Sequence, residues 1–204
     1  MKQKIQYDIK RLVRCALRYS RDIFAPKDGV PRYVVKWKTL NRFFCASAPV
    51  LESGTYLGES TAFFATIYPE VTSFEPYGPL AKYNTERFSK NQRIKIINKA
   101  SQHALDGILK NYDGKLNFWL DGHFSGLGTF GKIENASPVI QELNTIFSWE
   151  GSSEQNKALI AIDDARLFKG QNGYPTVLEV ANICNLFGYT LYVLNDIILI
   201  SKQN

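Results

Sequence analysis

The sequence contains few cysteines and no long apolar run. Cys15, Cys45 and Cys184 are far apart and lack the spacing of a metal site, which is typical of reduced thiols and predicts a cytoplasmic location. No stretch approaches the roughly 18 to 20 consecutive apolar residues of a membrane-spanning helix, and we expect no secretory signal at the N-terminus. Low-complexity tracts and internal repeats are also absent. With 204 residues, of which 45% are hydrophobic, the chain can form one core, with or without a small appendage.

Charge is distributed unevenly along the chain. Residues 1–48 hold 12 Lys/Arg and 3 Asp/Glu, whereas residues 49–204 hold 13 Lys/Arg and 16 Asp/Glu. The first segment also has one apolar helical face, made of Ile9, Leu12, Val13, Ala16, Leu17 and Ile23. It is predicted to form a basic helical cap, packed on the domain or on a second subunit. A membrane-surface helix and a clamp for an acidic substrate are less favoured alternatives, and no nucleic-acid partner is expected because no recognition motif accompanies the charge.

From residue 49 onward, short apolar runs alternate with longer helical patterns. This is typical of a doubly wound, mainly parallel α/β sheet. Helices are expected to start near Ser60, Leu80, Ala104, Ser137 and Thr176, with Ser137 as a cap followed by a proline in the first turn. Seven strands are expected, at 50–52, 71–74, 94–98, 116–120, 158–162, 189–193 and 197–200. The last two are too close in sequence for a crossover helix, so they must form an antiparallel hairpin.

A glycine-containing segment, ESGTYLGES at residues 52–60, follows the first expected strand. Gly54 and Gly58 allow sharp turns and a close approach of the backbone to a ligand, and Ser60 can cap the next helix. The spacing differs from G-x-G-x-x-G and the lysine of a P-loop is missing. A negative charge on Glu52 would repel a pyrophosphate but suit a cationic ligand, or hydroxyl and amine donors. Phosphate binding is therefore disfavoured here.

The second expected strand ends in another carboxylate, Glu75, 21 residues after Gly54. An acidic residue at this position is well placed to accept hydrogen bonds from both hydroxyls of a ribose. Taken alone, each glutamate fits a loop residue or a helix cap as well as it fits a ligand-binding residue. Two of them on successive strand ends, one beside a glycine loop, favour a nucleoside ligand.

The segment 52–60 resembles the E-x-G-x-Y-x-G-x-S segment of class I S-adenosylmethionine-dependent methyltransferases, especially the O-methyltransferase branch. The resemblance covers about residues 45–201 and implies a Rossmann-like sheet, with residues 49–204 as the S-adenosylmethionine-binding domain. It implies that Glu75 grips the ribose and that Ser101, within NKASQHAL, lies beside the adenine. The residues implied to hold the methionine part of the cofactor are Glu52, Gly54, Tyr56, Gly58 and Ser60.

Three aspartates follow the fourth and fifth expected strands. Asp121 ends WLD, and Asp163 and Asp164 end IAIDD. The ends of adjacent parallel strands lie about 5 Å apart, so these carboxylates converge if the strands are neighbours. Like charges that close repel one another, and a divalent cation that prefers oxygen ligands, such as Mg²⁺, relieves the repulsion. Alternatively, Asp163 caps a turn and Asp164 pairs with Arg166.

The same positions are similar to those of metal-dependent O-methyltransferases, of the catechol type and of the type acting on sugars of natural products. This resemblance implies that Asp121, Asp163 and Asp164 hold the metal, that Asp121 also faces the cofactor, and that the metal activates a substrate hydroxyl. The lysine that one branch carries after the fourth strand is missing, and His123 stands nearby. His123 is either a general base or a loop residue bonded to the backbone.

We therefore expect an O-methyltransferase that uses S-adenosylmethionine, with Mg²⁺ assistance, on a hydroxyl of a sugar, a glycan or another small polar acceptor. The basic cap favours an anionic acceptor, and Arg166, Lys169 and Tyr174 are candidate contacts to it. Three alternatives stay open: a metal-independent methyltransferase with His123 as base, a non-catalytic relative that binds the cofactor, and, less favoured, an NAD-dependent oxidoreductase. Homo-oligomer formation also stays open.

Overall fold

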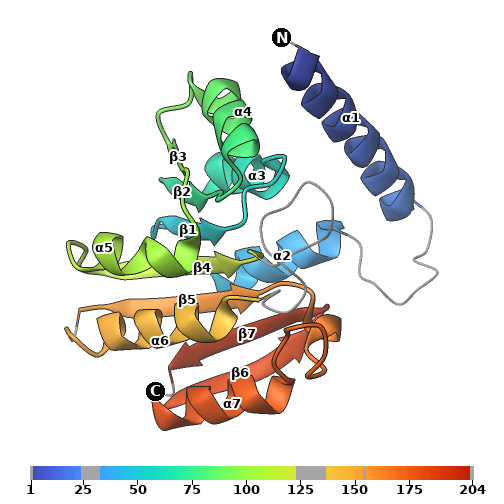
Figure 1. The fold of residues 1–204 in the computed structure, drawn as a ribbon. Coiled ribbons are helices and arrows are strands. Elements are labelled where there is room, and N and C mark those ends of the chain that lie inside the picture. The colour runs from blue at the N-terminus through green and yellow to red at the C-terminus, as the bar shows by residue number, and fades with distance from the viewer. Residues whose placement is uncertain (1, 24–32, 123–136, 154, 203–204) are drawn as a thin grey trace.

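The protein is described here from a computed structural model that covers residues 2–23, 33–122, 137–153 and 155–202 (Figure 1). In these residues seven strands form one sheet in the order β3-β2-β1-β4-β5-β7-β6. Strands β1 to β5 are parallel, and β7 is antiparallel to both β5 and β6. The strands are β1 (Val50–Ser53), β2 (Val71–Phe74), β3 (Ile94–Ile97), β4 (Lys115–Leu120), β5 (Lys157–Ile162), β6 (Tyr189–Leu194) and β7 (Ile197–Lys202). The predicted mostly parallel, seven-stranded sheet with a closing hairpin is confirmed.

Helices cover both faces of this sheet (Figure 1). Short 3-10 helices η1 and η3 follow β3 and β5, respectively. The helices and 3-10 turns are α1 (Lys2–Ile23), α2 (Tyr33–Phe43), α3 (Glu59–Ile67), α4 (Gly78–Phe88), η1 (Ser101–His103), α5 (Leu105–Leu109), α6 (Val139–Glu150), η3 (Ala165–Leu167) and α7 (Val177–Leu186). Such a layered arrangement buries both faces of the parallel strands, which explains their continuous apolar runs.

Alternation along the strands divides the core into two layers. Leu51 and Phe118 belong to the cluster that includes α5, α6 and α7 residues, whereas their neighbours Val50 and Trp119 belong to the cluster of α2 and α3. Successive side chains of a strand point to opposite faces, so β1 and β4 each supply both layers. The carboxyl ends of β1, β2, β4 and β5 are thereby held in one row.

The closing hairpin turns through Asn195 and Asp196. Both residues have positive φ, 53° and 64°, respectively. Two consecutive left-handed residues are the signature of a type I′ turn, whose twist matches the flanking strands and for which Asn and Asp are suited. The turn also brings Asp196 to the carboxyl end of β5, where its carbonyl accepts the N–H of Ala165.

Helix starts were predicted with unequal success. Thr176 is the N-cap of α7 and forms a capping box with Glu179. Ser60 does not cap α3, because Gly58 is the N-cap residue, in the left-handed region, and no side chain bonds there. Ser137 does not cap α6 either, because Pro138 takes the N-cap position and the helix starts at Val139.

The basic N-terminal segment contains two helices with different surroundings. α2 packs into the core through Leu40, which is fully buried, and Phe44 just beyond its end. α1 lies at the edge of the molecule (Figure 1), and most of its described apolar side chains are exposed. A cap formed by residues 1–48 stays a prediction. None of the helices in the described ranges combines the length and apolarity needed to cross a membrane.

Candidate functional site

The loop after β1 is built from residues with positive φ. Gly54, Tyr56 and Gly58 have φ values of 87°, 48° and 74°. A Cβ on Gly54 would lie 2.5 Å from the carbonyl oxygen of Asp121. A Cβ on Gly58 would lie 2.6 Å from Oδ1 of Asn84. The sharp turns expected at both glycines are present, and each glycine is also required by a contact inside the protein. The approach of a ligand to them stays a prediction.

Glu52 lies beneath this loop and is fully buried. Burial raises its pKa to about 7, although hydrogen bonds from the hydroxyls of Ser60, Ser73 and Thr61 lower it. Burial therefore weakens the negative charge that the sequence analysis gave Glu52. Its role in binding a cofactor stays a prediction.

Glu75, directly after β2, connects the glycine loop after β1 to the loop after β2. One carboxylate oxygen accepts the N–H of Tyr56 at 2.8 Å, and the other accepts the N–H of Tyr77 at 2.9 Å. The residue is 4% exposed. Burial raises the pKa of Glu75, and these two backbone hydrogen bonds oppose the shift. Glu75 therefore holds the glycine loop in place, and ribose binding by the same carboxylate stays a prediction.

Ser101, in η1, lies at the same edge of the sheet. Its hydroxyl is 3.0 Å from the hydroxyl of Ser53, the last residue of β1, and donates a hydrogen bond to the carboxylate of Glu142. Glu142 is 1% exposed and was missed by the sequence analysis. It occupies the apolar face of α6 with Val139 and Leu143, and a carboxylate on such a face was a readable signal.

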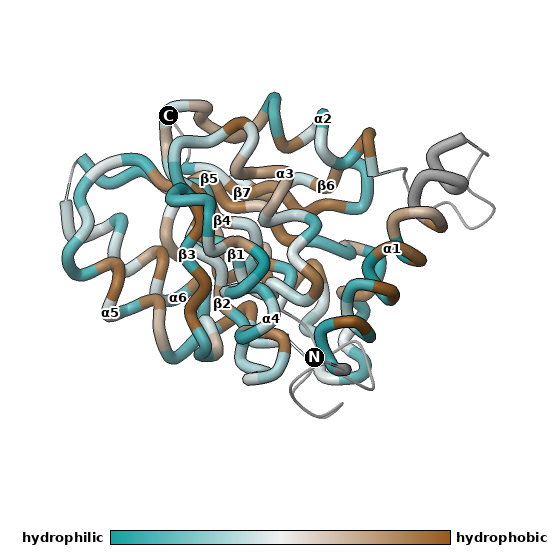
Figure 2. Tube along the Cα trace, turned by 90° about the horizontal axis from the view of Figure 1, so that it is seen from above, coloured by the Kyte–Doolittle hydropathy of each residue, from teal (hydrophilic) through white to brown (hydrophobic). Residues whose placement is uncertain are grey.

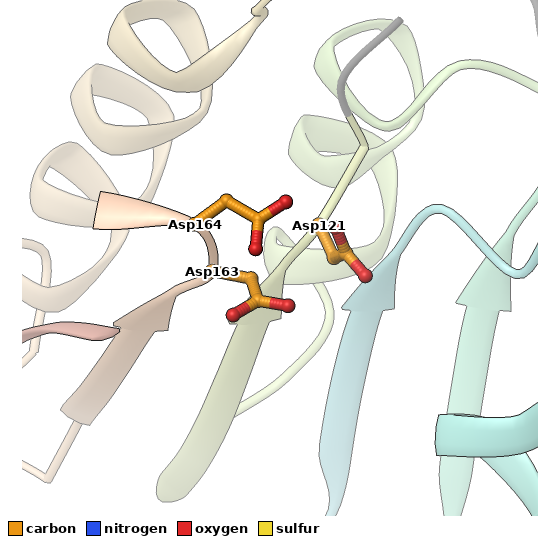
Figure 3. A group of neighbouring side chains, drawn as sticks. All are labelled: Asp121, Asp163 and Asp164. Carbon is orange, nitrogen blue, oxygen red and sulfur yellow. The ribbon is translucent and has the colours of Figure 1, made fainter. Parts of the chain in front are cut away.

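Asp121, Asp163 and Asp164 are brought together, as predicted (Figure 3). One oxygen from each carboxylate lies within 4.8 Å of the other two. The convergence follows from the pairing of β4 with β5, in register up to Leu120 and Ile162. Asp163 is 7% exposed, and burial, followed by repulsion from Asp164, raises its pKa. Asp164 has a φ of 56°, a left-handed conformation that Asp tolerates better than most residues.

Lys36 of α2 enters the same cluster, which the sequence analysis did not foresee. Its Nζ lies 2.5 Å from Asp163, 3.2 Å from Asp164 and 3.1 Å from Asp196. Burial by itself lowers the pKa of Lys36, but attraction to the three carboxylates outweighs it and the pKa lies above the ordinary value. The only sequence signal was a lysine four residues before Leu40 on the buried face of a helix.

Arg166 forms a second, more exposed cationic contact. Nη1 lies 2.6 Å from Oδ1 of Asp164 and also donates to Asp196, while its side chain is 42% exposed. The pairing of Asp164 with Arg166, left open by the sequence analysis, is present. Asp163 instead accepts a hydrogen bond from Lys36.

The donor set of this cluster, termed the acidic centre, fits a divalent cation. It comprises Asp121, Asp163, Asp164 and Asp196 with Lys36 and Arg166. Carboxylate oxygens gathered within 4.8 Å are the ligand type that Mg²⁺ takes. In the described part of the chain, Lys36 and Arg166 already contact three of these four carboxylates, so an ion bound there would share Asp163 and Asp164 with Lys36.

A pocket beside the acidic centre separates the tips of β4 and β5 from the start of α6. Asp163, Glu142 and Tyr174 contribute to it. Tyr174 is 9% exposed, and its ring packs edge-on against that of Phe168, with 5.6 Å between the ring centroids. Burial, helped by the carboxylates of Asp164 and Asp121, raises the pKa of Tyr174. Of the three loop residues expected to contact an acceptor, only Tyr174 lines this pocket, since Arg166 pairs with acids and Lys169 is exposed. His123 lies outside the described residues.

Comparison with known proteins gives a fold but no family. No protein-family model matches the chain, and no curated protein does. Among solved structures, SMU.1697c from Streptococcus mutans, assigned as a methyltransferase and solved in complex with SAH, has 13% identity and a TM-score of 0.53, covering 84% of this chain and 97% of that chain. A SAM-dependent methyltransferase from Aquifex aeolicus has 13% identity and a TM-score of 0.51, covering 85% of this chain and 89% of that chain.

An rRNA methylase from Streptococcus thermophilus is also similar, with 14% identity and a TM-score of 0.47, covering 83% of this chain and 95% of that chain. That score is too low to bear on the acceptor. The two matches above 0.5 cover most of this chain and support the fold alone. This chain has the Rossmann-like fold of S-adenosylmethionine-dependent methyltransferases.

Proposed function

We propose that this protein is an S-adenosylmethionine-dependent O-methyltransferase, assisted by Mg²⁺, that acts on a hydroxyl of a sugar, a glycan or another small polar acceptor. The observation that carries the proposal is the meeting of Asp121, Asp163 and Asp164 beside the glycine loop. This edge of an open α/β sheet, beyond the carboxyl ends of the strands, is where such folds bind ligands. The fold shared with a protein solved with SAH supports the choice of cofactor.

In this proposal the cofactor lies along the ends of β1, β2 and β4. The glycine loop holds the methionine part, Glu75 the ribose hydroxyls and Ser101 the adenine side. Glu52 acts from beneath the loop through the hydroxyls of Ser60 and Thr61, because it is fully buried. The two backbone N–H groups on Glu75 fix the direction of its carboxylate, which pre-organises it for a ligand.

The acidic centre would then bind and orient the acceptor. Asp121, Asp163 and Asp164 would hold Mg²⁺, which supplies Lewis-acid activation of a bound hydroxyl. When bound, S-adenosylmethionine would supply the methyl group from its sulfonium sulfur to the acceptor oxygen, and the hydroxyl proton would pass to a base, for which His123 is proposed. Lys36, 2.5 Å from Asp163, would oppose protonation of that carboxylate, and Phe168 and Tyr174 would supply an apolar wall beside it.

Thermal unfolding with added ligands tests the cofactor. At a concentration about a hundredfold above Kd, SAH should stabilise the protein by about 2.7 kcal/mol, whereas NAD should have no effect. Glu75→Gln should reduce the stabilisation by SAH. An equal response to NAD would favour the oxidoreductase, and no response to either ligand would contradict the proposal.

Calorimetric titration with Mg²⁺ in the presence of SAH tests the metal. Asp163→Asn should abolish the binding heat, while Asp106→Asn, a change to an exposed carboxylate that pairs with Lys110, should not. Methyl transfer that survives both Asp163→Asn and a chelator would favour the metal-independent alternative, and a changed pH–rate profile in His123→Ala would then identify the base. Binding of SAH without turnover on any hydroxylated acceptor would favour the non-catalytic relative.

The acceptor class rests on charge. The basic N-terminal segment favours an anionic acceptor, such as a phosphorylated glycan or a nucleotide sugar. That no nucleic acid is bound stays a prediction, as does the oligomeric state. A screen of hydroxylated acceptors, with RNA as one arm, would identify the acceptor.

A further inference from the structure

Helix α1 turns its apolar face away from the protein. The described apolar side chains of this face are strongly exposed: Ile5 51%, Ile9 57%, Leu12 59%, Val13 53% and Leu17 63%. They recur at helical spacing and form one stripe about 18 Å long. Figure 2 shows α1 at the edge of the molecule, with brown apolar positions alternating with teal ones. We call this stripe the outer face of α1.

The opposite, polar face of α1 contacts the domain. Asp8 accepts a hydrogen bond from the hydroxyl of Tyr83 at 2.8 Å, and Sγ of Cys15 donates to Glu59 at 2.9 Å. The guanidinium of Arg14 lies 4.7 Å from the ring centre of Tyr56. These contacts orient the helix so that its polar side is inside and its apolar side is outside, the reverse of an ordinary surface helix.

The charge of α1 indicates what its outer face binds. The helix carries seven Lys/Arg (Lys2, Lys4, Lys10, Arg11, Arg14, Arg18 and Arg21) and two Asp (Asp8 and Asp22). An apolar stripe in a strongly basic helix of high amphipathicity is the pattern of helices that lie in the interface of an anionic membrane. We propose that α1 docks the protein on an anionic lipid surface, with the outer face inserted among the lipids and the exposed basic side chains of the helix, such as Lys4, near the headgroups.

A second copy of the chain fits this face less well. A symmetric contact through α1 would bring two helices of equal positive charge together, and like charges across an interface are unfavourable. An anionic lipid surface instead neutralises that charge while it buries the apolar stripe. Charge complementarity therefore selects the lipid surface.

Docking through α1 would also orient the edge of the sheet that carries the glycine loop relative to the lipid surface. Tyr56 of the loop after β1 and Glu59, the first residue of α3, contact α1 directly, and Figure 1 shows α1 on the side to which the arrowheads of β1 and β4 point. A lipid surface bound to the outer face thus lies near the edge that carries the glycine loop. The inference about lipid binding does not depend on the proposed methyl transfer.

Sedimentation with vesicles tests the proposal. The full chain should bind vesicles of phosphatidylcholine mixed with phosphatidylglycerol, bind vesicles of phosphatidylcholine alone about tenfold less or weaker still, and be released by high salt. Ile9→Asp combined with Leu12→Asp should reduce binding to the mixed vesicles at least about tenfold. Lys4→Gln, which removes one exposed charge, should reduce it severalfold.

The matched control places two aspartates on a different exposed apolar surface. Leu178 and Leu186 of α7 are 69% and 82% exposed, and their change to Asp should leave vesicle binding unchanged. Absence of binding to the mixed vesicles would overturn the proposal, as would binding that Ile9→Asp/Leu12→Asp does not weaken. A concentration-dependent dimer that this double variant dissociates, without vesicle binding, would show that a second copy occupies the outer face.

Discussion

Two groups of buried carboxylates lie at the same edge of the sheet and are stabilised in different ways. Glu52 and Glu75, on the side of β1 and β2, accept hydrogen bonds from hydroxyl and backbone N–H groups. Asp163, on β5, is paired with the ammonium of Lys36. Burial raises the pKa in both groups, but only on the β5 side does a cation oppose it. Raised pKa values are therefore common to both groups, and only the second also depends on one buried cationic partner.

The largest expected effect comes from removing that partner. Lys36→Met would leave Asp163 buried without its cation, and removing one partner of a buried ion pair costs about 3 to 5 kcal/mol. Urea unfolding at pH 7 measures the loss. Lys38→Met is the matched control, because Lys38 is exposed on the same helix, and it should change the free energy of unfolding by less than about 0.5 kcal/mol. Equal effects of the two changes would remove the distinction between the groups.

The second effect is the pH response of Glu52. Its pKa is about 7 in the folded protein and 4.5 in the unfolded chain, so the folded state binds more protons between these values. The free energy of unfolding therefore falls as pH rises through this window, by on the order of 3 kcal/mol. Glu52→Gln should remove this contribution, so the variant should gain stability relative to the parent protein between pH 4 and pH 8. Parallel stability–pH curves would contradict the buried, near-neutral carboxyl.

A third, smaller effect concerns Gly54, through which the glycine loop after β1 packs against the backbone of Asp121 at the tip of β4. Gly54→Ala combines a positive φ with a Cβ 2.5 Å from the Asp121 carbonyl oxygen and should cost about 2 kcal/mol. Gly107→Ala is the control, because no heavy atom lies within 4 Å of its Cβ, and it should stabilise α5 by about 0.5 to 1 kcal/mol. Chemical denaturation of both variants tests whether the glycine loop rests on the tip of β4.

The smallest effect compares two cations that contact the same carboxylates, Asp164 and Asp196. Lys36 is buried, whereas Arg166 is partly exposed. Arg166→Gln removes a guanidinium that is 42% exposed, and because Asp164 and Asp196 also contact Lys36, the loss should be about 0.5 to 1 kcal/mol. Urea unfolding in low and high salt measures it, and salt should reduce the difference. A loss as large as that of Lys36→Met would show that Arg166, rather than Lys36, stabilises the acidic centre.

Much of the fold was predictable because its signals are local. Short runs of three to five residues identified every strand of the described chain, and the short link before Ile197 required a hairpin. Thr176 was identified as the start of a helix from the residues next to it in the sequence, and it is the N-cap of α7. Ser60 and Ser137 failed because the chain direction at those points, set by packing of Gly58 and Pro138, moved the caps to those residues.

The acidic centre was predictable only in part. The meeting of Asp121, Asp163 and Asp164 was predictable, because these residues come just after the ends of two neighbouring strands, β4 and β5. Lys36 was missed because it reaches Asp163 from 127 positions earlier in the chain, through a helix whose docking no local pattern specifies. Glu142 had a local signal, a carboxylate on the apolar face of a helix, but its bond to Ser101 spans 41 positions and follows only from the packing of α6.

By itself, the sequence determined the strands, their row of acidic ends and the basic, amphipathic character of the N-terminal helix, since these depend on the order and periodicity of residues. Tertiary structure alone decided that Lys36 neutralises the acidic centre, that Glu52 is a buried, weakly acidic carboxyl, and that α1 points its apolar face outward. Each depends on which surfaces meet in space. Burial and distance, which set the cost of a charge and the value of a pair, exist only once the chain has folded.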